Sequence, residues 1–507
     1  MELWAGRVLR HASEAAALGA TGLFGIHWRT RALSPQIAAL FQAGWSDTAP
    51  ADVDSFYTAW CAAEFGSGLR GNDSGGGEGA ESDRQQRENA LVQQACAPFR
   101  RLDKQECSGN CKGLEHYPSG CGDPGIANVF ATPDCLRPVA WGSTIGIVPN
   151  DTAFPRNVGY TPGNTGQGSP VPDPAQCAVD DLYDHWVDAF TGLGSELQAH
   201  GPAVVERWQY WDGQFRTMRA QARVNCAWAK QKAAFATLRR LTVAAKAPEL
   251  HDSGIPNIAT SPHPQHGSST DADRSSSEQR DAELSWTQAV DTALSTWIEL
   301  VQATGAMFTA LLESTTNAGE MGVVADLQDS KLPAILNATD RALLASALLR
   351  RKTDGGDGGG GLPAAAVPST SYAGRPRLFV PALRPFVERG QALAIRAILL
   401  SNATTAATTV TLQWRELSSS TTEPWHALPM TLQRAMPGAG GVWEGSIPPS
   451  SYASNCTMFE WAVESAAPTA GVAPCRFPAT APTRGQSVIV RTAVGTAAPT
   501  ARDGPTA

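Results

Sequence analysis

The spacing of apolar residues changes character along the chain. Up to about residue 66, apolar residues recur every three or four positions, as in amphipathic helices, around a short apolar run at residues 22–31 that is typical of a buried strand. Ser34 and Pro35 supply an N-cap and a first-turn proline for the next helix. The order helix, buried strand, helix predicts that residues 1–66 form the last α/β units of a TIM-type barrel.

Helical spacing also dominates the middle of the chain. We expect a helical domain, a bundle of long amphipathic helices, over residues 177–353. The polar stretch at 251–281 predicts a disordered insert within this domain. Residues 67–176 are rich in Gly, Ser, Pro and Cys, and they predict low-complexity and Cys-rich inserted loops around one helix.

The last third of the chain has the period of two that is typical of strands. A glycine-rich and then Ala/Pro-rich linker at 354–371 precedes an expected Ig-like antiparallel β-sandwich at 372–493, and a disordered tail follows at 494–507. The expected strands are 377–381, 391–400, 409–417, 427–433, 442–447, 457–464 and 487–491. The predicted fold class is multidomain α+β, with a partial (α/β) barrel end, an α-helical bundle and the C-terminal sandwich.

Composition narrows the classes of partner. The formal net charge of the 507 residues is −8, and Lys and Arg form no stripe interleaved with aromatic residues, which argues against a nucleic-acid partner. No window of eighteen consecutive apolar residues predicts a membrane span. No cofactor and no metal site are expected, and the oligomeric state stays open.

Cysteines and glycosylation sequons indicate an oxidising secretory route. We expect the full-length protein to be secreted, although the start of this chain has no signal peptide; either the protein is intracellular or its true start is missing. The predicted glycosylation sites are Asn72, Asn150, Asn337, Asn402 and Asn455.

Six cysteines are the main disulfide candidates. Four of them crowd one loop, where disulfides would reduce the entropy of a long excursion, and a zinc site with His116 is the alternative. Two more flank an expected hairpin of the sandwich and could pair across it. The candidates are Cys107, Cys111, Cys121, Cys135, Cys456 and Cys475.

The carboxyl end of the expected strand at 22–31 carries the best candidate site. In α/β barrels this end faces the ligand, so His27, Trp28, Arg29 and Arg31 are predicted to bind substrate, with the indole as a platform for a sugar ring. The alternative is that these side chains close the bottom of the fold or pair with neighbouring acids.

A catalytic pair of carboxyl groups, as glycoside hydrolysis usually requires, is not found in the sequence. Glu64 and Asp103 look like ordinary helix-end acids, and Glu320 lies between two glycines in an expected helix C-terminal turn. Trp208 and Trp211 have the spacing of core residues. The catalytic residues are therefore unknown.

Several separated stretches together resemble the carboxyl-terminal half of large bacterial-type glycoside hydrolases with a hexosaminidase-like or α-glucuronidase-like TIM-barrel architecture. They are residues 19–31, Arg207 with Tyr210-Trp211, residues 215–219, residues 319–322, and residues 477–482 before the strand at 487–490. The resemblance implies a barrel whose catalytic acids lie on earlier strands, followed by a helical region and an Ig-like sandwich.

Three functions follow as expectations. The first is the C-terminal portion of a glycoside hydrolase acting on an oligo- or polysaccharide, inactive alone because its catalytic acids are missing from this chain. The second is a non-catalytic carbohydrate-binding or extracellular matrix protein. The third is a degenerate gene product with no stable fold at its amino end.

Overall fold

A computed structural model describes most of the chain outside the expected loops and tails. The described residues are 5–22, 31–45, 52–66, 78–103, 187–246, 270–353, 361–402, 408–417, 424–451, 456–466 and 474–491.

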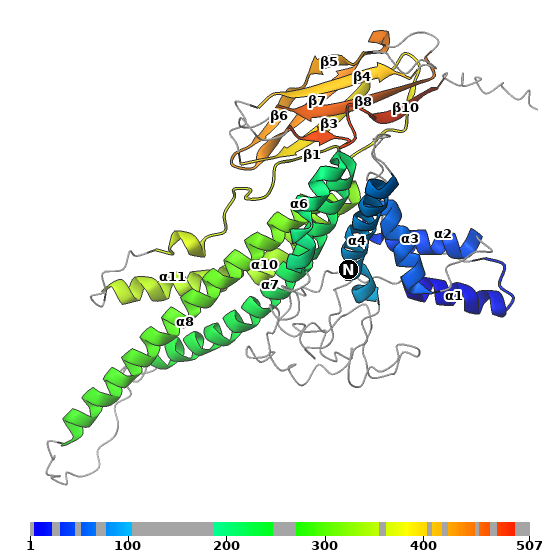
Figure 1. The fold of residues 1–507 in the computed structure, drawn as a ribbon. Helices are drawn as coiled ribbons and strands as arrows, with labels where there is room; N and C mark the ends of the chain where they lie inside the picture. Colours follow the sequence, from blue (N-terminus) through cyan, green and yellow to red (C-terminus); the bar gives the residue numbers. More distant parts are fainter. Residues whose placement is uncertain are drawn as a thin grey trace, which may run out of the picture.

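A long antiparallel pair of helices forms the centre of the molecule (Figure 1). Helix α7 (Pro202–Lys246) runs away from the sandwich, and helix α8 (Thr270–Ser314) returns to it. The two backbones approach closely near the sandwich at Gly213, where a Cβ atom would lie 2.9 Å from Cβ of Ser314. This close approach holds α7 and α8 together at the end of the hairpin that lies against the sandwich.

The amino-terminal helices pack beside the same half of the hairpin (Figure 1). Their bounds are α1 (Ala5–Ala17), the 3₁₀ turn η1 (Arg31–Leu33), α2 (Ser34–Trp45), α3 (Val53–Phe65) and α4 (Glu78–Asp103). Helix α3 begins after Asp52, whose carboxylate accepts a hydrogen bond of 2.7 Å from the Ser55 amide. Helix α1 ends before Gly19, which has a φ of 78°.

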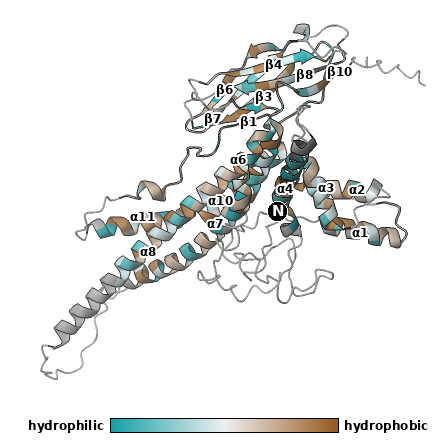
Figure 2. Cartoon of the chain, in the orientation of Figure 1, coloured by the Kyte–Doolittle hydropathy of each residue, from teal (hydrophilic) through white to brown (hydrophobic). Residues whose placement is uncertain are grey.

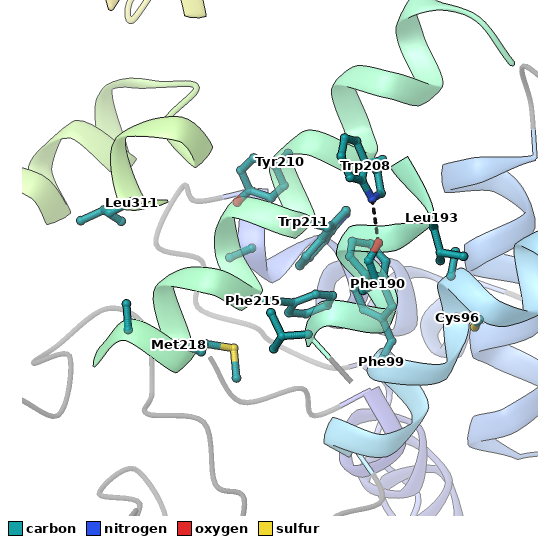
Figure 3. Close-up of a cluster of buried hydrophobic side chains, with 14 of the residues drawn as sticks. Cys96, Phe99, Phe190, Leu193, Trp208, Tyr210, Trp211, Phe215, Met218 and Leu311 are labelled. Carbon is teal, nitrogen blue, oxygen red and sulfur yellow. Dashed lines mark hydrogen bonds between the residues drawn. The ribbon is translucent and has the colours of Figure 1, made fainter. Parts of the chain in front are cut away.

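Aromatic rings from α3, α4 and α7 interlock in the largest core (Figure 3). The Phe99 ring lies 4.8 Å from Trp211 and 5.2 Å from Phe215, edge to face, and Trp60 lies 5.6 Å from Trp211. Side chains from the first 66 residues and from α7 therefore share one core. Trp208 and Trp211 are buried, as their spacing predicted.

Shorter helices complete the helical region. They are α6 (Gly194–Leu197), η3 (Gln198–His200), α9 (Ala318–Asp326), the π-helical turn η5 (Leu327–Lys331), α10 (Leu332–Ile335) and α11 (Ala338–Thr353). Helix α11 packs on α8 and α7 around Trp297 and Phe235.

Two sheets form the sandwich, in the strand orders β1-β3-β7-β6 and β2-β10-β8-β4-β5, with β9 paired to β8. Burial alternates along the inner strands, and hydrophobic and hydrophilic positions follow each other closely on them (Figure 2). The strands are β1 (Arg377–Phe379), β2 (Phe386–Glu388), β3 (Leu393–Leu400), β4 (Val410–Glu416), β5 (His426–Pro429), β6 (Thr431–Met436), β7 (Gly440–Ile447), β8 (Met458–Ser465), β9 (Arg476–Phe477) and β10 (Gln486–Arg491).

Six of the seven expected strands are present as single strands, whereas the expected strand at 427–433 is divided into β5 and β6, which belong to different sheets. The sandwich is also not purely antiparallel. The structure adds the short strands β2 and β9, and β2 pairs with β10 in parallel. A three-residue and a two-residue strand have too little alternation for a period to be recognised in the sequence.

The barrel expectation for residues 1–66 is not supported. The described residues of this segment form helices, and neither sheet of the described chain closes into a barrel. Helices α1 and α2 pack on each other and on α3, and α3 packs on α7, so the apolar sides of these helices meet other helices instead of a parallel sheet. Most of the expected strand, residues 23–30, lies outside the described residues.

Two further boundaries differ from expectation. Residues 270–281 of the expected disordered insert belong to α8, because the helix extends beyond its apolar pairing with α7. The second half of the expected linker packs on the helices: Ala366 is fully buried, and its carbonyl accepts a hydrogen bond of 2.9 Å from the Trp297 indole.

Disulfide pairing also differs from expectation. Cys61 of α3 is bonded to Cys96 of α4, and neither was a candidate. Neither Cys456 nor Cys475 forms a disulfide. Cys475 donates its amide to Ser465 at one end of β8, whereas Cys456 precedes the other end, and nine residues of strand span roughly 30 Å. This distance is several times what a disulfide can bridge.

The Cys61–Cys96 disulfide closes a loop with a sequence separation of 35 residues. The disulfide reduces the conformational entropy of the unfolded chain. We therefore expect the double variant Cys61→Ala/Cys96→Ala to lose about 3 kcal/mol of unfolding free energy. Thermal and urea unfolding followed by circular dichroism measure this loss. Cys475→Ala, at a free thiol, is the control and should change stability much less; equal midpoints for the double variant and the unaltered chain would contradict the prediction.

Candidate functional site

Arg31 is the centre of a cluster of charged and aromatic side chains between the helices. Its Nη1 lies 2.6 Å from Oε1 of Glu206, and its Nη2 lies 3.4 Å from Oε1 of Glu64. The guanidinium carbon lies 4.6 Å from the centre of the Tyr210 ring. We refer to Arg31, Glu64, Glu206, Tyr210 and Glu320 as the Arg31 cluster.

Electrostatics keep Arg31 charged and Tyr210 neutral. Burial works to lower the pKa of Arg31, but Glu206 and Glu64 outweigh it, and the pKa is raised above its ordinary value. Burial, and then the nearby Glu320 carboxylate, raise the pKa of Tyr210 well above 10. Arg31 is therefore a permanent cation and Tyr210 a neutral donor.

Glu320 lies in the first turn of α9, not in the C-terminal turn that its flanking glycines suggested. Asn317 caps this helix by accepting from the Glu320 amide at 3.0 Å. The buried Glu320 carboxylate accepts from the Tyr210 hydroxyl at 2.8 Å, from the Arg31 amide at 3.1 Å, and from both the amide and the hydroxyl of Thr316 at 2.6 Å. Four donors make it a structural anchor between α7, α9 and η1.

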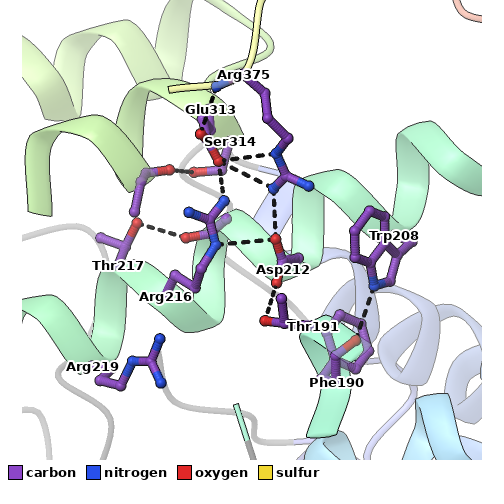
Figure 4. Close-up of polar contacts among 12 residues, drawn as sticks. Phe190, Thr191, Trp208, Asp212, Arg216, Thr217, Arg219, Glu313, Ser314 and Arg375 are labelled. Atoms are coloured by element: carbon purple, nitrogen blue, oxygen red, sulfur yellow. Dashed lines mark hydrogen bonds and ion pairs between the residues drawn. The ribbon is translucent and has the colours of Figure 1, made fainter. Parts of the chain in front are cut away.

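A second cluster joins the helices to the sandwich (Figure 4). Arg375, just before β1, donates from its amide to Glu313 at 2.8 Å and from Nη2 to Asp212 at 2.5 Å. Arg216 lies between the same two acids, 3.0 Å from Asp212 and hydrogen-bonded to Glu313. We refer to Asp212, Arg216, Glu313 and Arg375 as the Glu313 cluster.

Glu313 is strongly biased toward its charged form. Burial is the largest influence and works to raise its pKa, but Arg216 and Arg375 together outweigh it, so that the pKa lies below the ordinary value of 4.5. The Glu313 carbonyl also accepts a hydrogen bond from Arg377 of β1. Glu313, at the end of α8, thus interacts with three arginines: Arg216 and Arg375 through its carboxylate and Arg377 through its carbonyl.

A pocket of about 620 Å³ opens between the helices and the sandwich beside these clusters, and we refer to it as the junction pocket. Its walls come from residues 198–209, Thr316, residues 376–379 and residues 474–480. Its volume is within the usual range for small-ligand sites. Glu206 belongs to both the junction pocket and the Arg31 cluster.

Of the predicted substrate-binding residues, Arg31 alone is described, and His27, Trp28 and Arg29 lie outside the described residues. The Arg31 guanidinium is occupied by two carboxylates and a ring, so the alternative role, pairing with neighbouring acids, fits it.

Of the predicted glycosylation sites and the remaining disulfide candidates, some are described by the structure and others are not. Asn337 and Asn402 are described. The candidates outside the described residues are Asn72, Asn150, Asn455, Cys107, Cys111, Cys121 and Cys135.

Sequence reasoning missed the charged residues that line up on α7. Glu206 and Tyr210, and likewise Asp212 and Arg216, are four residues apart and so share a helix face. Charged residues at helical spacing among buried aromatics were the available signal. Arg375 and Arg377 had no such signal, because their partners are over sixty residues away.

Two general findings concern the described part of the chain. None of its helices is long and apolar enough to cross a membrane. Nor do its His, Cys, Asp and Glu residues form a group of three or more that could hold a metal ion.

Comparisons with known proteins identify no family. No family model matches the chain, and no curated protein is significantly similar to it. Among solved structures, a Pseudomonas fluorescens alkylpurine DNA glycosylase, AlkC, bound to DNA containing an abasic site analogue is 11% identical, with a TM-score of 0.15. The match covers 62% of this chain and 87% of that chain. A score this low carries no argument about fold or function.

These comparisons overturn the resemblance to glycoside hydrolases, since none of them returns such an enzyme. The stretches that suggested it have structural reasons to be there. Tyr210 and Trp211 belong to buried clusters, and the buried Glu320 carboxylate accepts hydrogen bonds from Tyr210 and Thr316.

The Glu313 cluster predicts a specific dependence of stability on pH. Because the pKa of Glu313 is lowered in the folded chain, its stabilisation is complete above the ordinary carboxyl pKa and is lost as the pH falls below it. We expect Glu313→Gln to cost about 3 kcal/mol at pH 7 and progressively less toward pH 3.5. Unfolding midpoints of both chains across this pH range measure the difference.

An exposed ion pair gives the control for this measurement. Glu444 pairs with Arg396 on the sandwich surface at 3.0 Å, and Glu444→Gln should cost less than about 1 kcal/mol at every pH. A cost of Glu313→Gln that stays constant between pH 7 and pH 3.5 would show that the carboxylate charge is not what joins the two regions.

Proposed function

We propose that this chain is a non-catalytic saccharide-binding protein and that the junction pocket is its binding site. The observation that carries the proposal is a pocket of about 620 Å³ whose walls come from both the helices and the sandwich. Ligand sites occur preferentially at such interfaces between domains.

The lining of the pocket supports a ligand with many hydroxyl groups. Gln198 and Gln209 offer amide groups that both donate and accept hydrogen bonds, and the Thr316 hydroxyl, which donates to Glu320, can still accept one. Phe477 adds an apolar ring, held by stacking on Trp461 at 5.8 Å between centroids. A sugar ring presents hydroxyls at its edge and C–H groups on its face, which matches this combination.

The number of carboxylates in the pocket favours a binding function over hydrolysis. Glycoside hydrolysis usually requires two carboxyl groups on either side of the scissile bond. Among the described residues that line the pocket, Glu206 is the single carboxylate, and Arg31 holds its Oε1 at 2.6 Å. An ion-paired carboxylate without a second acid favours a binding role.

We also propose that the protein is secreted. The Cys61–Cys96 disulfide supports this proposal because such bonds persist in oxidising compartments. Asn402 follows the end of β3 and is exposed, so a glycan attached to it would extend into solvent.

A pocket-filling substitution tests the binding site. Ala203 lines the pocket in the first turn of α7, so that Ala203→Trp should lower saccharide affinity at least about ten-fold by occupying the space. A glycan array followed by titration calorimetry of the hits measures the loss. Ala342→Trp, at an exposed position of α11, is the matched control and should leave affinity unchanged. Equal affinity in both variants, or no saccharide bound by the unaltered chain, would overturn the proposal.

The two described sequons should differ in glycosylation. The side-chain oxygen of Asn337 caps α11 by accepting from the Thr339 amide at 2.8 Å, whereas Asn402 is exposed. We expect glycopeptide mass spectrometry of protein secreted from eukaryotic cells to find Asn402 modified and Asn337 largely unmodified. Modification at Asn337 with none at Asn402 would contradict this prediction.

A further inference from the structure

Positively charged side chains are concentrated at the junction pocket, although the net charge of the chain is −8. Three arginines line it, Arg207, Arg377 and Arg476, against the single carboxylate Glu206. The Glu206 carboxylate is paired with Arg31 and also stabilises the charge of Arg377, so that one acid is shared among several guanidinium groups. The excess of positive charge is therefore a local feature of the pocket.

The arginines are fixed to the pocket walls by different contacts. Arg207 donates from Nε to the Glu64 carbonyl, and Arg476 pairs with Glu464 at 3.1 Å. Arg377 donates from Nη1 to the Glu313 carbonyl, while its buried Nε has no hydrogen-bond partner. The remaining guanidinium donors of these arginines can form charge-assisted hydrogen bonds with an oxyanion.

Helix α7 contributes a further positive end. Ala203 lies in its first turn and lines the pocket, and Gly201 stands at the position where a capping side chain would be. The first amides of a helix have no acceptor within it, and they carry the positive end of the helix dipole. The first turn of this helix lines the same pocket as the three arginines.

We infer that the junction pocket is selective for a saccharide that bears an oxyanion, either a carboxylate or a sulfate group. This inference rests on the proposed saccharide-binding function and adds the chemical class of the ligand. Arg377 and Arg476 bind the anionic group at the sandwich side of the pocket, and the amide and hydroxyl side chains of the helical side bind the ring hydroxyls.

Titration calorimetry with matched ligands tests the selectivity on the full chain. Digalacturonate, its methyl ester and a sulfated disaccharide differ in the presence or kind of anionic group. We expect at least one of the two anionic ligands to bind about ten-fold or more tightly than the methyl ester, with the difference shrinking at high salt. Whether digalacturonate or the sulfated disaccharide binds better decides which oxyanion the pocket takes.

Substitutions locate the selectivity. Arg377→Lys keeps the charge but removes the planar donor group, and Arg476→Gln removes an exposed cation whose loss the fold tolerates more easily. Each should reduce the preference for the anionic ligand over the methyl ester about five-fold or more. Arg434→Gln, at an exposed position of β6 outside the pocket, is the control.

The outcomes separate the two proposals. Equal affinity for the methyl ester and both anionic ligands would overturn the inference and leave the saccharide-binding function standing. If none of the ligands binds, and no hit emerges from the glycan array, both proposals fall. A preference that Arg377→Lys and Arg476→Gln leave intact would also overturn the inference, because the anion would then bind elsewhere.

Discussion

The buried carboxylate of Glu313 is the interaction on which the arrangement of the molecule depends. It lies at the end of α8 and pairs with Arg216 of α7 and with Arg375, which leads into the sandwich. The same residue accepts a hydrogen bond from Arg377 of β1 through its carbonyl. A buried charge without its partners is costly, so the helices and the sandwich are held in one relative position. The backbone bond of 3.0 Å from Ala318 to Pro381 adds to this fixation.

Helix α7 connects this junction to the rest of the helical region. One of its faces carries Trp211 and Phe215 into the aromatic core, and another carries Glu206 and Tyr210 into the Arg31 cluster. The first turns of this helix line the junction pocket. Its shape therefore depends on contacts on both sides, and a ligand that touches both walls would stabilise the assembled junction through its binding free energy.

The sequence predicted the regular elements well where their period was sustained. Six of the seven expected strands of the sandwich are present as single strands, because half-buried strands alternate visibly along the sequence. The expected strand at 427–433 is divided between the two sheets as β5 and β6, which local alternation could not show. Short strands such as β2 had no such pattern. The barrel expectation failed because one apolar run and its neighbouring helices have the same local pattern whether they cover a sheet or a helix. For the site, the local pattern singled out Glu64 and Glu320 as helix-end acids but could not show that Arg31 lies near both.

By itself, the sequence determined which segments form helices and strands, since apolar period, caps and turn residues act over a few neighbouring positions. It also determined the excess of acidic residues and the presence of both cysteines and sequons. The tertiary structure alone decided which charges meet. Glu313 and Arg375 are 62 residues apart, and Arg31 and Glu320 are 289 apart, and no local rule specifies such pairs. The pocket also depends on the tertiary structure, because its two walls belong to the helices and to the sandwich, which ion pairs, hydrogen bonds and apolar contacts bring together.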